Sequence, residues 1–268
     1  MEFNTLFPDT RLRPETRIAK CQAVMLRMLK IFDFLCNEHQ IEYFLIGGSL
    51  LGAIRHQGFI PWDDDLDLGM TRANYERFVT EVVPLLPGDI FFQTTETDPK
   101  YPACDYVDAK LRDRYSRYTK NKYQYHDGLQ LDIFVYDKAF IPSNFFIILQ
   151  NFLLKGTNNN ARRAKVLKWI SRTIPNKLVY TCNYLHNWAQ LTYGRFFFYK
   201  KELTPLIRVK FEDMEVTIPN GWHDSLTRQY GNYMELPPEN KRTTHHIEQP
   251  EPCLPCDHKE SLVWTNNI

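Results

Sequence analysis

At 268 residues, with 43% hydrophobic and 24% charged residues, the chain has the composition of a globular protein of one elaborated domain or two small ones. Its formal net charge of +1 gives no global excess of basic residues, so we expect no binding to nucleic acid. Residues 1–17 are too polar for a signal peptide, and no uninterrupted apolar run is long enough to cross a membrane.

The N-terminal part of the chain predicts two helices with a strand between them. Residues 15–39 repeat apolar side chains at helical spacing, and Pro14 suits a helix start. A β-rich apolar run at 41–46 ends in Gly47-Gly48-Ser49, which is typical of a strand followed by a tight turn. We expect a short helix over 49–56, with Ser49 as its N-cap.

The following segments predict a mixture of strands and helices. In DLDLG, acidic residues alternate with leucines, as they do in a half-buried strand. Strands are expected over 65–69, 105–113 and 128–137, a hairpin over 206–219, and helices over 72–86 and 222–230, the last ended by Gly231. These elements predict an α/β (α+β) fold with a mixed β-sheet core and flanking helices.

Charge is distributed unevenly along the chain. Residues 138–201 contain eleven Lys or Arg and no Asp or Glu, which leaves an acidic remainder. Helices are predicted there over 144–155, 161–172 and 176–194. The expected organisation is a catalytic core at 1–137, a basic helical insert at 138–201, and a C-terminal hairpin, helix and tail at 202–268. We expect the apolar face of the insert to pack on the core, and its basic face to meet a polyanionic, lipid-linked acceptor or a membrane surface.

The densest charge lies in PWDDDLDLG at 61–69. Asp65 and Asp67 are two residues apart on the predicted strand, so both should point to one face. Two carboxylates held together repel each other, and a cation between them removes the conflict. Mg²⁺ suits that position, because it takes hard oxygen ligands and binds through one or two carboxylates plus substrate phosphates. The alternative, a solvated acidic loop, does not account for the alternating leucines.

Two other segments complete the predicted site. Asp132 is a lone acid among apolar residues in LQLDIF, which makes it the best candidate for a third carboxylate on a neighbouring strand. Gly47-Gly48-Ser49 closes a strand and opens a helix, where backbone N–H groups converge on an anion. A glycine turn, a short helix, an acidic strand and a later acidic strand form the pattern of nucleotidyltransferase-type enzymes.

The sequence FLIGGSLLGAIRHQGFIPWDDDLDLGM at 44–70 resembles the signature of the LicD family, the phosphocholine transferases of bacterial surface glycans. Fukutin and the fukutin-related protein are more distant relatives of that family. The similarity continues in LQLDIF and in FEDMEVTIPNGWHDSLTRQYGNYMELPP, so it spans roughly residues 15–245. The core motif of 27 residues is long and unusual in composition, which makes the resemblance specific.

The resemblance implies a nucleotidyltransferase-like core that moves phosphocholine from CDP-choline to a sugar hydroxyl. The acceptor is typically a hexosamine in a teichoic acid or lipopolysaccharide precursor, and the metal is Mg²⁺ or Mn²⁺. The resemblance gives catalytic and metal-ligand roles to Asp63, Asp65 and Asp67, and a third-carboxylate role to Asp132. It places Arg55 beside the site. Asp132 or Asp63 is the expected general base.

Several side chains near this site have two interpretations. Arg55 suits bidentate contact with phosphate, but it equally suits a salt bridge to the aspartates. Lys110 suits either a phosphate clamp or a solvated strand face. The choline ammonium requires an aromatic face, for which Trp62, Tyr101 and Tyr106 are closest in sequence, although packing is the ordinary role of each.

The C-terminal tail raises the question of zinc. His245, His246, Cys253, Cys256 and His258 include a C-x₂-C spacing, but the second half of the site is not a clean pair. We expect no catalytic zinc, because a hard, oxygen-ligated ion serves this phosphoryl transfer better. The six cysteines mostly lie in apolar segments and indicate reduced thiols, hence a cytoplasmic protein with peripheral attachment to the inner membrane surface as a further expectation.

Two other functions compete with phosphocholine transfer. One is the transfer of another phospho-alditol, ribitol or glycerol phosphate, from a CDP donor. The other is a non-catalytic scaffold that uses its acidic pocket only to hold a nucleotide. The intact set of four aspartates argues against the scaffold.

Overall fold

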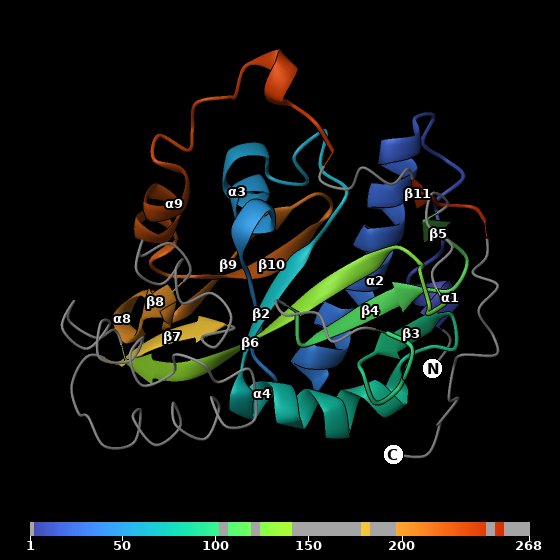
Figure 1. Cartoon of the computed structure of the whole chain (residues 1–268), viewed down its shortest axis with the longest axis horizontal. Coiled ribbons are helices and arrows are strands. Elements are labelled where there is room, and N and C mark those ends of the chain that lie inside the picture. Colours follow the sequence, from blue (N-terminus) through green and yellow to red (C-terminus); the bar gives the residue numbers. More distant parts are fainter. Residues whose placement is uncertain are drawn as a thin grey trace, which may run out of the picture.

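The computed structural model describes residues 3–101, 107–118, 124–140, 178–182, 197–244 and 250–254. Its helices and strands follow one another in the order shown in Figure 1. They are α1 (Phe3–Leu6), α2 (Arg17–Glu38), β1 (Phe44–Leu45), α3 (Gly47–His56), β2 (Asp67–Thr71), α4 (Arg72–Arg77), β3 (Ile90–Gln93), β4 (Ala109–Asp113), β5 (Arg117–Tyr118), β6 (Gln130–Phe140), β7 (Leu178–Cys182), β8 (Phe197–Tyr199), α8 (Lys200–Leu203), β9 (Leu206–Phe211), β10 (Met214–Pro219), α9 (Trp222–Tyr230) and β11 (Pro250–Glu251).

Seven of the described strands form one mixed sheet. The strand order is β1-β2-β6-β4-β3, and β7 and β8 extend the sheet from the second half of β6. β2 and β6 run parallel, whereas the other neighbouring pairs are antiparallel. Figure 1 shows β6 running through the middle of this sheet. The mixed α/β fold expected from the sequence is confirmed.

The predicted N-terminal helix is present as α2. Thr16 is its N-cap, because the side chain accepts a hydrogen bond from the Ala19 N–H at 3.3 Å. Met25, Met28 and Phe32 are buried in the main core, where α2 contacts β4 and β6. Neither α2 nor any other helix within the described ranges is long and apolar enough to cross a membrane.

The glycine turn and the acidic strand are both displaced from their predicted limits. α3 begins at Gly47, with Ile46 and not Ser49 as the N-cap residue. β2 begins at Asp67, because the preceding chain forms a turn in which the Asp63 N–H bonds the carbonyl of Ile60 at 2.9 Å. The prediction that Asp65 and Asp67 share one strand is therefore wrong.

The hairpin over 206–219 and the helix over 222–230 are confirmed with the predicted ends. The hairpin is formed by β9 and β10, and α9 ends at Gly231, whose φ of +69° is a conformation that suits glycine. The helix predicted over 72–86 begins as α4, then continues as a π-helical turn (Phe78–Val82) and a 3₁₀ turn (Val83–Leu85). Pro84 has no N–H to continue an α-helix, which accounts for the tightened last turn.

Part of the basic insert is β structure. β7 pairs antiparallel with the second half of β6, and β8 pairs with β7. The helix prediction over 176–194 is therefore wrong for Leu178–Cys182. This segment, LVYTC, contains β-branched and aromatic residues that suit a strand, and the length of β6 beyond β4 offers it a free edge. The helices predicted over 144–155 and 161–172 lie outside the described residues.

Candidate active site

Three predicted site residues lie side by side across the central sheet. The parallel register of β2 and β6 pairs Asp67 with Asp132. The antiparallel register of β6 and β4 pairs Asp132 with Lys110. Because paired residues on neighbouring strands project to the same face, the sheet carries a row of two carboxylates and one ammonium. The expectation that Asp132 lies on the strand next to Asp67 is confirmed.

Lys110 and Asp132 form a buried ion pair. The Lys110 Nζ donates to Asp132 Oδ1 at 2.6 Å and to Oδ2 at 2.8 Å. Their side chains are only 8% and 11% exposed, so water screens this pair little. Gln130 Nε2 also donates to Asp132 Oδ2 at 3.3 Å. The alternative of a solvated strand face for Lys110 is therefore wrong, and both side chains are fixed in position.

The two glycines of the turn bring α3 against the aspartates. Gly47 has a φ of +54°, and a Cβ at this position would lie 3.2 Å from Asp67 Oδ2. A Cβ on Gly48 would lie 3.1 Å from Asp63 Oδ2. Both carboxylates thus pack against the main chain of the first turn of α3, at distances that leave a side chain little room. Ser49 is buried and its Oγ accepts a hydrogen bond from the Asp67 N–H at 2.8 Å, which ties α3 to the start of β2.

The carboxylates share one electrostatic environment. The pKa of Asp67 is raised well above its ordinary value, first by burial and then by the negative charges of Asp65, Asp132 and Asp63. The ammonium of Lys110 opposes this rise in pKa. Although Asp65 lies outside β2, its charge therefore acts on Asp67 as the sequence led us to expect. Four acids and one base leave a net negative site, which favours a bound cation.

This donor set suits a hard divalent cation that also binds the substrate. Among the described residues, no three Asp, Glu, His or Cys side chains enclose a metal position by themselves. Mg²⁺ seldom needs such a cage, because it usually takes one or two carboxylates and completes its shell with water and substrate phosphates. Asp67, which packs against the α3 turn, and Asp65, the carboxylate whose charge acts most strongly on it, fit that arrangement. Of the tail residues proposed for zinc, Cys253 is exposed, and the other four lie outside the described residues.

The raised pKa of Asp67 predicts a specific pH dependence of stability. Asp67 stays protonated up to a higher pH in the folded protein than in the unfolded chain, where an Asp titrates near pH 4. Asp67 therefore destabilises the metal-free protein progressively as pH rises from about 4 to its folded pKa. Melting temperatures in chelator should show Asp67→Asn becoming more stable than wild type over this window. Added Mg²⁺ should reduce this difference in melting temperature between the variant and wild type. A difference that does not vary with pH would contradict the shared electrostatic environment of these carboxylates.

Arg55 anchors the loop that follows α9. Its Nη1 donates to the main-chain carbonyl of Tyr233 at 3.0 Å and to that of Glu235 at 3.5 Å. Its Nε donates to His56 Nε2 at 3.0 Å. Burial lowers the pKa of Arg55, and the positive charge of Arg242 lowers it further. The salt bridge to the aspartates is not formed among the described residues, whereas a phosphate contact is compatible with these neutral partners.

Tyr230, at the C-terminal end of α9, faces the aspartates and was not predicted as a site residue. Although the residue is 45% exposed, its pKa is raised, first by partial loss of water around the hydroxyl and then by the charges of Asp67, Asp63 and Asp65. The helix itself was predicted, but only the contact between α3 and α9 brings its last residue to the site. Figure 1 shows these two helices next to each other. The continued resemblance through residues 211–238 was the available signal, since it marked this segment without assigning it a role.

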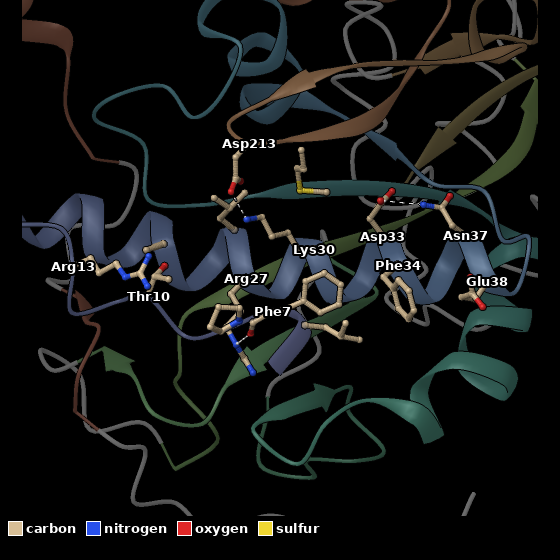
Figure 2. Close-up of a pocket in the computed structure, with 15 residues that line it drawn as sticks. Phe7, Thr10, Arg13, Arg27, Lys30, Asp33, Phe34, Asn37, Glu38 and Asp213 are labelled. Carbon is tan, nitrogen blue, oxygen red and sulfur yellow. Dashed lines mark hydrogen bonds and ion pairs between the residues drawn. The ribbon is translucent and has the colours of Figure 1, made fainter. Parts of the chain in front are cut away.

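Figure 2 shows a pocket on the outer face of α2, away from these residues. It has a volume of about 650 Å³, and its lining includes none of the predicted site residues. Lys30 pairs with Asp213 at 2.7 Å, and Asp33 pairs with Arg208 at 2.6 Å. Because four of its six charged residues, Arg27, Lys30, Asp33 and Asp213, are already in ion pairs, we assign no chemistry to this pocket.

Comparison with known proteins identifies relatives of this chain. A family model described as LicD/FKTN/FKRP, nucleotidyltransferase domain, matches residues 40–165. Lipopolysaccharide cholinephosphotransferase LicD of Haemophilus influenzae is 29% identical, over 85% of this chain and 95% of the relative. An uncharacterized protein of Rickettsia prowazekii is 26% identical over 80% of this chain and 57% of its own length.

A short match connects the chain to a second group of transferases. Ribitol 5-phosphate transferase FKRP of human is 63% identical over 30 residues, and the mouse protein matches equally. The match covers 11% of this chain and 6% of each relative. It is therefore a similarity of one motif and not of the whole protein.

Proposed function

This chain carries a nucleotidyltransferase domain of the LicD family, and from that premise we propose that it transfers phosphocholine from CDP-choline to a sugar hydroxyl of a bacterial surface glycan precursor, a lipopolysaccharide or teichoic acid. The name of the Haemophilus relative supports both the phosphocholine group and the glycan acceptor. The observation that carries the proposal is the packing of Asp63 and Asp67 against the first turn of α3, with Asp132 on the adjacent strand.

The site residues would have separate roles in an in-line displacement at phosphorus. Asp65 and Asp67 would hold Mg²⁺ or Mn²⁺, which would neutralise charge on the diphosphate. The N–H groups at Gly47 and Gly48, at the start of α3, would donate to a diphosphate oxygen and orient it. The acceptor hydroxyl attacks the choline-bearing phosphorus, the bond from phosphorus to the CMP oxygen breaks, and CMP leaves with that electron pair.

We assign the role of general base to Asp63, which would accept the proton of the acceptor hydroxyl. Both oxygens of Asp132 already accept hydrogen bonds from Lys110, and Gln130 donates to one of them, so this carboxylate is held by fixed partners. Asp63 Oδ2 instead lies at the α3 turn, where the donor phosphate would be held. In this arrangement Asp132 positions Lys110, whose fixed positive charge would oppose the charge developing on the transferred phosphoryl group.

The proposed activity is tested by following CMP release. Purified protein should release CMP from CDP-choline rapidly when Mg²⁺ or Mn²⁺ and a hexosamine-containing acceptor are both present, and a chelator should abolish the release. Slow hydrolysis of CDP-choline without the acceptor, again dependent on metal, is also expected because water can replace the hydroxyl. If neither CDP-choline nor another CDP-alcohol gives metal-dependent CMP release, the non-catalytic scaffold is the remaining function.

A second candidate function is transfer of ribitol or glycerol phosphate from a CDP donor. The 30-residue match to the ribitol 5-phosphate transferases favours it. Ribitol carries hydroxyls and no charge, whereas choline carries a cation and no hydroxyl. Equal concentrations of CDP-choline and CDP-ribitol in the CMP-release assay separate the two functions, and preferred use of CDP-ribitol would contradict our assignment.

The basic insert predicts association with an anionic surface. Arg162, Arg163, Lys165 and Lys168 fall within seven residues in an otherwise acidic protein. Each basic group near an anionic surface contributes about 1 kcal/mol at best, so replacing all four with Gln should weaken binding to anionic vesicles by more than about tenfold. Metal-dependent hydrolysis of free CDP-choline should change little.

Wild-type binding to vesicles should also fade as salt rises, because exposed charges are screened over about 10 Å at 0.1 M. Vesicles of neutral lipid serve as the control surface. If the quadruple variant sediments with anionic vesicles as wild type does, the charge of the insert has another role.

A further inference from the structure

Trp62 presents an aromatic face beside the acidic site. It directly precedes Asp63, it is half-buried, and it packs against the main core. His56 lies edge-on to the indole, with ring centroids 6.2 Å apart. The guanidinium carbon of Arg242 lies over the indole ring, 5.4 Å from its centroid. This ring face therefore already holds a cation in the structure.

Arg242 is held on that face by weak contacts. Its Nε donates to the main-chain carbonyl of Pro237 at 2.9 Å. Its ion pair with Glu239 is at 4.0 Å, and the Glu239 side chain is 91% exposed, so the pair contributes little. Arg55 is a nearby like charge that disfavours a second guanidinium. Another cation could thus replace Arg242 over the ring at low cost.

The proposed donor carries a cation of the right kind. A quaternary ammonium has no N–H to donate, so it is recognised by aromatic faces and by surrounding negative charge. In phosphocholine only one oxygen and two carbons separate the ammonium from phosphorus, so its site must lie next to the residues that hold the phosphate. Of the three aromatic residues considered from the sequence, Tyr101 is buried and Tyr106 lies outside the described residues, which leaves Trp62.

We propose that the face of Trp62 now covered by Arg242 is the ammonium subsite of the donor, and that Arg242 leaves the ring when the donor binds. The inference rests on the proposed function, because only a choline-bearing donor supplies this cation. It makes Trp62 a specificity-determining residue, since a neutral CDP-alcohol gains nothing from displacing Arg242.

The test compares a donor whose alcohol carries a cation with a donor whose alcohol is neutral. Dissociation constants for CDP-choline and the neutral CDP-glycerol are measured by calorimetry with Mg²⁺ present, and the ratio of the two constants reports the subsite. Trp62→Leu should reduce the preference for CDP-choline about fivefold to thirtyfold, the range that cation–π contacts span. Trp62→Phe should retain most of the preference. Arg242→Gln should increase it, because the competing cation is gone.

A matched control separates the subsite from lost packing. Trp222 also packs against the main core and lies edge-on to a neighbouring histidine, His223, at 5.7 Å. Trp222→Leu should therefore cost similar stability, measured by thermal melting, without changing the ratio of the two constants. Should Trp62→Leu fail to fold, Arg242→Gln still decides the matter, because it leaves the core intact.

Each outcome either supports or overturns the inference. The subsite is overturned if Trp62→Leu weakens the binding of both donors equally, or if Arg242→Gln leaves the preference for CDP-choline unchanged or reduced. The proposed function is retained in either case if the protein still releases CMP from CDP-choline. A selective loss in Tyr230→Leu in place of Trp62→Leu would assign the ammonium to Tyr230 and would also overturn the inference. If wild type neither binds nor cleaves CDP-choline, both the proposed function and the ammonium subsite that rests on it are contradicted.

Discussion

Replacing Asp65 or Asp67 with Asn is expected to reduce phosphocholine transfer at least about a hundredfold, with the fold intact. A catalytic metal ligand contributes several kcal/mol to stabilising the transition state, and Asn removes the negative charge but keeps the size of the side chain. Asp67 packs against Gly47, and the charge of Asp65 acts on it, so each variant should weaken the proposed cation site. Initial rates of CMP release at saturating Mg²⁺ give the measurement.

Two neighbouring acids serve as controls for this loss. Asp137 lies on β6 and pairs with exposed Arg72, so Asp137→Asn should keep nearly full activity. Asp64 is fully buried and acts electrostatically on Cys21 and Tyr118, away from the α3 turn. Asp64→Asn should therefore alter the melting temperature more than the rate. Near-normal transfer by either Asp65→Asn or Asp67→Asn would remove the metal assignment.

Replacing Lys110 with Met is expected to lower the free energy of unfolding by about 3 to 5 kcal/mol, the usual cost of breaking a buried ion pair from one side. The loss arises because Asp132 would remain buried with neither oxygen bonded to an ammonium. Transfer should fall as well, since the fixed positive charge beside the donor phosphates is gone. Denaturant unfolding in chelator isolates the stability effect from metal binding.

A second ion pair that involves β6, between Arg72 and Asp137, offers a comparison for the buried pair of Lys110 and Asp132. Arg72 pairs with Asp137 of β6 at 2.7 Å, but the two side chains are 45% and 50% exposed. Arg72→Met should therefore cost no more than about 1 kcal/mol. In the double variant Lys110→Met with Asp132→Asn, most of the lost stability should return, because no buried charge is left unpaired. A double variant no more stable than Lys110→Met would show that the cost lies in packing.

The candidate site could be predicted from the sequence as far as its residues lie in local motifs. The glycine turn, the acidic run and the β strand that carries Asp132 are each readable from composition and alternation, and their neighbour relation follows from the fold class. The start of β2 at Asp67 could not be read in this way. It depends on the turn at Ile60 and on Ser49, which bonds the Asp67 N–H from a different helix.

Long-range contacts account for what the sequence did not predict. Tyr230 reaches the aspartates only because α9 packs on α3, and Arg55 bonds carbonyls that lie 178 and 180 residues further along the chain. The helix prediction over 176–194 is wrong for Leu178–Cys182, whose β-branched and aromatic residues suit a strand. The free edge of β6 decides its structure, and that edge is a property of the assembled sheet.

The in-register pairing of β2 with β6 also limits how the length of the chain can change during evolution. Side chains alternate along a strand, so a single residue inserted within β2 would reverse every position on one side of the insertion. Leu68, now in the core, and Asp67 would then compete for the same face. A deletion within β6 would separate Asp132 from Lys110 in the same manner. Insertions between β3 and β4 shift neither pairing, so loop length is free to diverge there while these strands keep their residue count.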